Sequence, residues 1–245
     1  MGLVGAVPIV GALRVKNEAR WLARVLESIE PLCDDCFVFD DHSTDGTPEI
    51  ARQFGANVIE SAFDGLDEGR DKDCMLDAVL SAYREPWVLC IDGDEILAPG
   101  GAETLRGNIE SGAAGVWALH VRYLWDSETQ WRTDGVYGKF SRPSLFHARA
   151  GQRFQRTSAG GNFHCGNVPT WVHGKSAQSE AALLHLGYML REDRVRKYEW
   201  YNRIDGKNAL EDGYRHMVVG DVFPAHSVFR YGGPLKLEAL CTQAA

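Results

Sequence analysis

The chain has 245 residues, of which 44% are hydrophobic and 24% are charged. This composition is typical of a folded domain, so it excludes a disordered, collagen-like or coiled-coil chain. The 26 basic and 34 acidic residues give a formal charge of −8, which argues against a nucleic-acid partner bound by phosphate neutralisation.

Targeting signals are weak in this sequence. No apolar run approaches the roughly 20 residues that span a bilayer, so we expect no transmembrane segment, although peripheral membrane contact stays open. The apolar start, residues 1–13, has no basic residue ahead of it and is interpreted as a buried strand rather than a signal peptide. Cys33 and Cys36 form a C-x-x-C without a second pair to close a zinc site. We therefore expect free thiols and a cytoplasmic location.

The first half of the chain alternates between two periodicities. Continuous apolar runs predict four buried strands, at residues 7–13, 36–40, 57–60 and 87–91. Helical spacing predicts three helices between them, at residues 19–29, 47–54 and 72–83. Thr47 is the expected N-cap of the second helix and Pro48 its first residue. The alternation predicts an α/β fold with a mostly parallel sheet and helices on both faces, which binds ligands beyond the carboxyl ends of its strands.

The second half has a different pattern. Residues 115–124 predict a long strand, and two short aromatic strands follow at 137–140 and 144–147. We expect loops over 150–182, a polar helix over 192–208 and a weakly patterned tail. The chain therefore divides into an α/β half, residues 1–112, and a C-terminal strand, loop and helix segment, residues 113–245, of the same domain.

Three polar motifs lie at the predicted strand ends. Asp92-Gly93-Asp94-Glu95 follows the fourth strand, and two carboxylates that flank a glycine there suit Mg²⁺ or Mn²⁺. The alternative is an acidic turn with a helix cap. Asp40 and Asp41 end the second strand, where a carboxylate could accept from a nucleotide base or ribose. Residues 43–47 are interpreted as a turn and cap, and Asn17 and Glu18 follow the first strand at the same edge.

The ordered set of motifs resembles the nucleotide-sugar-dependent glycosyltransferases of family 2, which have the GT-A fold. The matching pieces lie in family order and spacing over roughly the first 110 residues, at Val15–Glu18, Asp40–Thr47, Glu49–Ala51 with Gly55–Ala56, and Trp87–Glu95. The resemblance implies a nucleotide-sugar-binding half at residues 1–112 and an acceptor side at 113–245.

The resemblance also implies roles for individual residues. Asp40 or Asp41 would contact the donor's base, and Asp92 and Asp94 would hold a metal on the donor diphosphate. Arg70 and Lys72 occupy the stretch where the family often has a basic residue near the phosphates. Asn17, Glu18 and Asp92 complete the expected donor-binding set.

The second half offers candidates for the remaining roles. His185 looks like the histidine that completes the metal site in several GT-A enzymes, although a core histidine is the alternative, and His164, His173 and His226 compete for the role. A basic cluster follows it, which would either be a solvated helix face or close over the diphosphate; its members are Arg191, Arg194, Arg196 and Lys197.

The sequence offers several carboxylates as the catalytic base. Asp134 is our first candidate and Asp193 its rival, while Asp126 is as reachable as Asp134. Four aromatic residues could stack on a sugar ring or pack in the core, namely Trp125, Trp131, Tyr137 and Trp171.

The predicted activity is metal-dependent displacement of a nucleoside diphosphate from a sugar, with inversion implied by the resemblance. The acceptor is a carbohydrate, lipid, peptide or small molecule. Two alternatives stay open: a sugar nucleotidyltransferase, whose Gly-rich signature after the first strand is absent, and a non-catalytic carbohydrate-binding protein of the same fold. The missing G-x-G-x-x-G after the first strand argues against a dinucleotide oxidoreductase.

Overall fold

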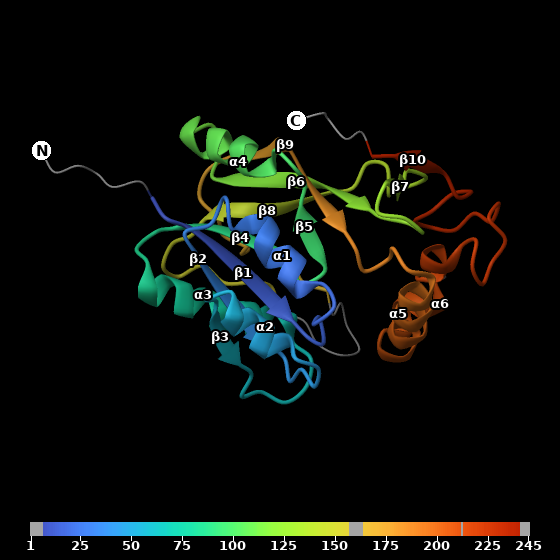
Figure 1. Cartoon of the computed structure of the whole chain (residues 1–245), viewed down its shortest axis with the longest axis horizontal. Helices are drawn as coiled ribbons and strands as arrows, with labels where there is room; N and C mark the ends of the chain where they lie inside the picture. Colours follow the sequence, from blue (N-terminus) through green and yellow to red (C-terminus); the bar gives the residue numbers. More distant parts are fainter. Residues whose placement is uncertain (1–6, 157–163, 212, 241–245) are drawn as a thin grey trace, which may run out of the picture.

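A computed structural model describes residues 7–156, 164–211 and 213–240. These residues contain an eight-stranded sheet in the order β3-β2-β1-β4-β8-β6-β9-β5 (Figure 1). Its parallel half consists of β1 (Ile9–Val15), β2 (Asp35–Asp40), β3 (Asn57–Glu60) and β4 (Trp87–Asp92).

The other half of the sheet is mixed. It consists of β5 (Glu95–Leu97), β6 (Val116–Tyr123), β8 (Ser141–His147) and β9 (Ser176–His185). Strand β8 runs antiparallel to β4 and β6, whereas β6 and β9 are parallel, and β5 is antiparallel to β9. Strands from both halves of the chain thus share one sheet.

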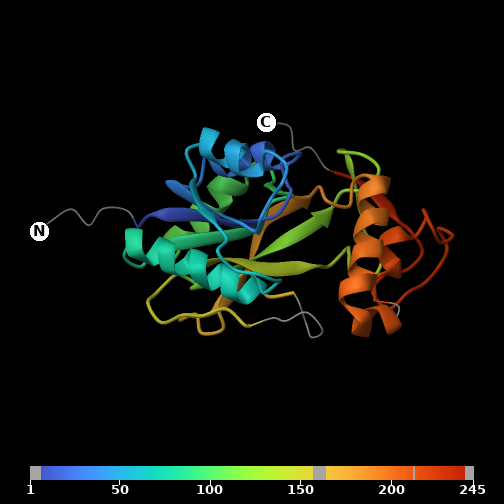
Figure 2. The same cartoon turned by 90° about the horizontal axis from the view of Figure 1, so that it is seen from below.

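Helices cover both faces of the sheet, as Figure 2 shows. On one face lie α1 (Leu22–Ile29), α2 (Thr47–Gln53) and α4 (Gly101–Glu110), and on the other lies α3 (Glu68–Ala82). The alternation of side chains along β1 explains the two layers, because Leu13 and Val15 pack with α1 while Val10 and Ala12 pack with α3. The predicted α/β architecture is confirmed.

A C-terminal unit stands at the end of the sheet where β1 and β6 finish (Figures 1 and 2). It contains α5 (Arg191–Ile204), α6 (Gly206–Leu210) and the 3₁₀ helix η1 (Arg215–Val218). Leu66, in the loop before α3, packs against the aromatic cluster of this unit. Nearby, β7 (Gln130–Arg132) and β10 (Leu237–Ala239) form a small antiparallel sheet.

Several predicted boundaries were wrong. Residues 176–182, expected to be loop, belong to β9, and the short β5 and the helix α4 were not predicted. The expected helix over 192–208 ends at Ile204, and α6 follows after Asp205. The N-cap of α2 is Gly46 rather than Thr47, because the Thr47 hydroxyl instead accepts the backbone N–H of Glu18 at 2.8 Å.

Candidate active site

The motif after β4 is brought against the end of β9 by strand pairing. Asp92 ends β4 and Glu95 begins β5, so the chain reverses over Gly93 and Asp94. Glu95 lies opposite His185 in the β5–β9 register, and the Leu186 N–H donates to the Asp94 carbonyl at 2.8 Å. Asp94 and His185 are therefore neighbours although 91 residues separate them along the chain.

The Asp94 carboxylate faces two side chains. Its Oδ1 lies 3.9 Å from His185 Nε2, and its Oδ2 accepts a hydrogen bond from Lys197 Nζ at 2.6 Å. Asp94 and His185 are both buried. Burial lowers the pKa of His185 to about 4, so the imidazole is neutral near pH 7 and keeps a lone pair for a metal or a proton.

Two glycines make this close packing possible. A Cβ on Gly187 would fall 1.9 Å from Asp94 Oδ2 and 2.3 Å from Lys197 Nζ. A Cβ on Gly93 would fall 2.9 Å from the Cγ of Glu18. Any side chain at position 187 would therefore displace the Asp94–Lys197 pair, and any side chain at 93 would displace Glu18.

Asp92 belongs to a second charge cluster beside the first. Arg142, on β8, donates to Asp92 Oδ2 at 3.0 Å and also to the buried Glu95. Burial alone would raise the pKa of Asp92, but Arg142 and then Lys72 hold it below its ordinary value. Burial raises the pKa of Glu95 to about 7. Arg142 thus neutralises the strand-end carboxylates from the sheet side.

The loops after β1 and β2 are tied to each other. The Asn17 N–H donates to Ser43 Oγ at 2.8 Å, and the Thr44 N–H donates to Asn17 Oδ1 at 2.7 Å. Asn17 has a φ of 55°, a left-handed conformation that asparagine tolerates. Asn17 therefore ties the loop that carries Glu18 to the loop after Asp40, and its side-chain oxygen is already used as an acceptor.

The two strand-end aspartates of β2 have different environments. Asp41 accepts from Arg14 Nη2 at 2.6 Å and from Lys16 at 3.4 Å. Asp40 is also buried; its Oδ2 accepts the Ser43 N–H, while its Oδ1 has no hydrogen-bond partner among the described residues. Asp40 therefore has a buried acceptor atom, Oδ1, without a partner among the described residues, and the contacts of Asp41 are made through its Oδ2.

The two basic residues predicted near the phosphates are engaged within the fold. Arg70 donates to Asp71 at 2.8 Å and to the Gly65 carbonyl at 2.9 Å, and it stacks on Phe63. Lys72 is buried and donates to Asn167 Oδ1 at 2.9 Å. Lys72 lies close enough to lower the pKa of Asp92, whereas Arg70 lines a separate hollow beside α3.

The two candidate bases have contrasting positions. Asp134 accepts two hydrogen bonds from Arg132, at 2.7 and 2.8 Å, and one from the Gly233 N–H at 2.8 Å. It has no contact with Asp94 or His185 among the described residues. Asp193 lies in the first turn of α5, one turn before Lys197, and accepts from Arg196 at 2.9 Å. The structure brings Asp193, not Asp134, to the element that contacts Asp94.

The remaining candidate histidines, Arg194 and the four aromatic residues differ in exposure and in their partners. His173 and His226 are exposed, and His164 packs edge-on against Tyr201. Arg194 is buried under Trp125, where it bridges Asp126 and Asp221, so it is neither a solvated residue nor one available to a diphosphate. Trp125 and Tyr137 are buried as well, which leaves exposed Trp171 and half-buried Trp131 of the four aromatic candidates.

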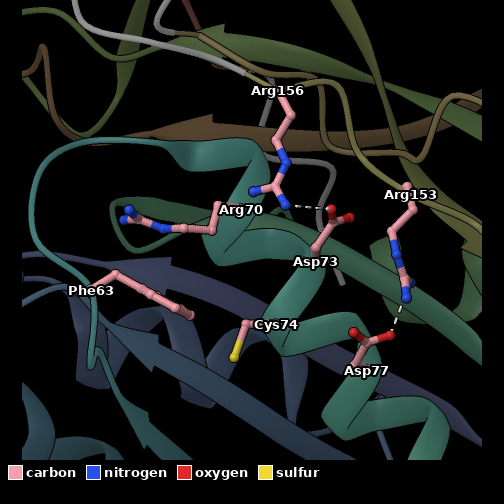
Figure 3. A pocket seen from close by; sticks show the side chains of 7 residues that line it. All are labelled: Phe63, Arg70, Asp73, Cys74, Asp77, Arg153 and Arg156. Carbon is pink, nitrogen blue, oxygen red and sulfur yellow. Dashed lines mark ion pairs between the residues drawn. The ribbon is translucent and has the colours of Figure 1, made fainter.

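A separate hollow of about 490 Å³ lies on the outer side of α3 (Figure 3). Its lining includes three arginines, Arg70, Arg153 and Arg156. Arg153 pairs with Asp77 at 2.9 Å, and Arg156 lies 3.9 Å from Asp73. The charges of the hollow are thus balanced locally, and none of the strand-end carboxylates lines it.

The residues around Asp94 fit a metal ion that takes some of its ligands from the protein and the others from a bound substrate. Among the described residues, no group of three or more His, Cys, Asp or Glu is placed to hold a metal ion by itself. Asp94 Oδ1 and neutral His185 Nε2, however, face each other within 3.9 Å. Mg²⁺ and Mn²⁺ commonly take one or two protein ligands together with substrate phosphates and water.

Comparison with known proteins identifies the family. Residues 13–168, more than half of the chain, match the family described as glycosyl transferase family 2. A TPR repeat-containing protein of Synechococcus elongatus is 31% identical over 142 residues, 58% of this chain and 32% of that protein. An uncharacterized glycosyltransferase of Rickettsia felis is 36% identical over 86 residues, 34% of this chain and 27% of that protein. The matches span about a third or less of these relatives.

A solved structure supports the fold. S. aureus TarS 1-349 is 14% identical, with a TM-score of 0.51, over 86% of this chain and 70% of that one. Glucosyl-3-phosphoglycerate synthase from Mycobacterium tuberculosis, in complex with Mn²⁺, UDP and glucosyl-3-phosphoglycerate, is 27% identical over 48% of this chain and 44% of that one, with a TM-score of 0.37.

The chain belongs to glycosyl transferase family 2. Its α/β fold is of the GT-A type, as the sequence motifs had predicted. In the part of the chain that the structure describes, no helix is long and apolar enough to cross a membrane.

Sequence reasoning missed two arginines of the site. Arg142 lies in a strand, in the segment Ser141-Arg142-Pro143, and Arg14 lies near the end of β1. Each is the one arginine in a strand with several apolar residues, and a lone cation in such a strand could have indicated a buried charge pair. Lys197 was noticed only as one member of a basic cluster.

Proposed function

We propose that this glycosyltransferase moves a sugar from a nucleoside-diphosphate donor to an acceptor nucleophile, with Mn²⁺ or Mg²⁺ at Asp94 and His185. The observation that carries the proposal is the Asp94 Oδ1 to His185 Nε2 approach of 3.9 Å at the carboxyl edge of a family 2 sheet. Asp92, on the same turn, is the third metal candidate. A bound metal would supply positive charge to the leaving diphosphate.

The chain's own residues have distinct tasks in this proposal. Asp40, through its unpartnered Oδ1, accepts from the donor's base or ribose, and Asp41 and Asn17 hold the loops around it. Arg142 and Lys72 keep Asp92 ionised near neutral pH. Glu18 lies at the same sheet edge and belongs to the proposed donor site. Arg70 acts indirectly, because it binds Asp71, and Asp71 in turn binds Arg14.

Asp193 is the proposed acceptor base, ahead of Asp134. Both carboxylates are buried and paired with arginine, Asp134 with Arg132 and Asp193 with Arg20 and Arg196. A base must lie near the hydroxyl that it deprotonates, and only Asp193 lies on the helix that contacts Asp94. Hydrogen bonds from Arg132 and from backbone N–H groups also hold the pKa of Asp134 below its ordinary value, despite its burial. Displacement by a hydroxyl activated at Asp193 would proceed with inversion. The acceptor is a carbohydrate, lipid, peptide or small molecule, and we propose that the reaction takes place in the cytoplasm.

Donor turnover tests the proposal. With water as the acceptor of the sugar, we would measure nucleoside-diphosphate release by hydrolysis of UDP-, GDP-, dTDP- and CDP-sugars in the presence of Mn²⁺. The proteins compared are the parent, Asp94→Asn and Glu103→Gln, which lies on the exposed side of α4. We expect Mn²⁺-dependent release that falls at least about 100-fold in Asp94→Asn and is unchanged in Glu103→Gln. Equal turnover in folded Asp94→Asn would contradict the metal assignment, and no turnover of any donor would favour a non-catalytic protein.

A further inference from the structure

Lys197 is the basic residue of α5 that is directed into the strand-end cluster. Its ammonium lies 2.6 Å from Asp94 Oδ2, and its side chain is only 20% exposed. The other basic residues of the cluster have different partners: Arg191 and Arg194 bind Asp221, and Arg196 binds Asp193. Lys197 is therefore the member of this cluster that shares a ligand with the proposed metal.

Lys197 is the main source of positive charge next to the Asp94 carboxylate. Arg142 is already bound to Asp92 and Glu95, and His185 Nε2 lies 3.9 Å from Asp94, beyond hydrogen-bond distance. Lys197 is thus the cation that directly pairs with Asp94 among the described residues. A divalent metal at Asp94 Oδ1 would lie close to this ammonium, and like charges at such a distance repel strongly when partly buried.

The backbone of the β9–α5 connection packs closely against one side of the Asp94–Lys197 ion pair. Gly187 lies directly under the ion pair, since a Cβ there would overlap both Asp94 Oδ2 and Lys197 Nζ. The Tyr188 ring lies 5.5 Å from Nζ, on the next residue. The ion pair and a metal therefore share one small volume over the β9–α5 connection.

We propose that Lys197 couples metal binding to diphosphate binding. Without donor, the ammonium occupies Asp94 and weakens metal binding to Asp94 and His185. A donor diphosphate offers strong anionic acceptors to the ammonium, so Lys197 turns from Asp94 to phosphate oxygens and frees the carboxylate for the metal. Because such coupling is reciprocal, the metal favours the diphosphate by the same factor. This inference rests on the proposed function.

Mn²⁺ binding to the full chain without nucleotide tests the inference. Electron paramagnetic resonance of free Mn²⁺ would give the dissociation constant for the parent, Lys197→Met and Lys207→Met, which removes an exposed lysine of α6. We expect Lys197→Met to bind Mn²⁺ about tenfold tighter or more, because one nearby positive charge has been removed, and Lys207→Met to bind like the parent. Lys197→Gln replaces the Met variant if the latter does not fold.

A double variant locates the effect. Adding Asp94→Asn to Lys197→Met should abolish the tighter binding. Equal or weaker Mn²⁺ binding by Lys197→Met, or tight binding that survives in the double variant, would overturn the inference. These outcomes are distinct from failure of the proposed function, because donor turnover by the parent protein is measured separately and does not depend on how Lys197 acts.

Discussion

Glu18 illustrates how single side chains at the sheet edge depend on their neighbours. Its side chain packs against Gly93, the residue that separates Asp92 from Asp94 in the sequence. Burial, with repulsion from Asp94, raises the pKa of Glu18 to about 8, from an ordinary value of 4.5. Ionising this carboxyl therefore costs the folded state free energy in the absence of a metal.

The raised pKa of Glu18 predicts a pH-dependent stability difference. The folded state holds the proton more tightly than the unfolded chain, so the destabilisation is absent below pH 4.5, grows as the pH rises and is complete above about pH 8. Glu18→Gln removes it. Urea unfolding in EDTA should show equal stability at pH 4.5 and a gain of at least about 1 kcal/mol for Glu18→Gln at pH 8.5.

The control for this measurement is Glu27→Gln, on the solvent side of α1. It should follow the parent protein at every pH. Parallel stability curves for Glu18→Gln and the parent would mean that Glu18 does not carry a raised pKa in the folded protein.

Residues at strand ends could be predicted, whereas their cross-strand partners could not. Asp92 and Asp94 were found because they directly follow an apolar run, and His185 because of the resemblance of its segment. Arg142 reaches Asp92 only through the β4–β8 pairing, and no local pattern encodes that pairing. The saturation of Asp134 by Arg132 depends equally on the folded C-terminal segment, through Gly233 and Lys236.

At the scale of elements, regular periodicity decided what was predictable. The strands and helices of the first 92 residues have clear apolar patterns and were found, apart from the first turn of α3. Strand β5 has only three residues, and β9 begins with polar residues at the sheet edge, Ser176 and Gln178 among them. Both take their structure from pairing with β6 or with each other rather than from local preference.

Arg194 ties the first turn of helix α5 to two neighbouring loops. Its guanidinium is buried and donates to Asp221 at 2.7 and 3.0 Å, to Asp126 at 2.7 Å and to two carbonyls at the start of the helix. The same helix carries Asp193, the proposed base, and Lys197, which contacts Asp94. The position of these two residues therefore depends on a residue that contacts no substrate in our account.

Arg194→Met should loosen α5 selectively. It leaves Asp221 without its strongest partner, and breaking a buried pair in this way costs about 3 kcal/mol. Chymotrypsin cleavage at Tyr198, Trp200 or Tyr201 under native conditions should accelerate about 100-fold, since local opening becomes that much more frequent. Arg203→Met, on an exposed position of the same helix, should be cleaved like the parent; equal rates for both variants would refute the role of Arg194.

At the scale of the molecule, the sheet brings both halves of the chain to one edge. β1, β2 and β4 deliver Glu18, Asp40 and Asp94 from the first half, and β9 and α5 deliver His185 and Lys197 from the second. The boundary at residue 112 thus separates two sequence patterns, while the proposed site uses residues from both sides. The division into a donor part and an acceptor part stays a prediction.

Thermal unfolding with nucleotides tests the central claim, that Asp94 and His185 hold a metal together with a donor diphosphate. The parent protein and Asp94→Asn would be melted with UDP, GDP, dTDP or CDP, each with and without Mn²⁺. A nucleotide at about 100 times its dissociation constant adds roughly 2.7 kcal/mol, which is roughly 5–10 °C for this size of chain. We expect one nucleotide to give this shift only with Mn²⁺ and only in the parent. An equal shift in Asp94→Asn, or none with any nucleotide, would contradict the account.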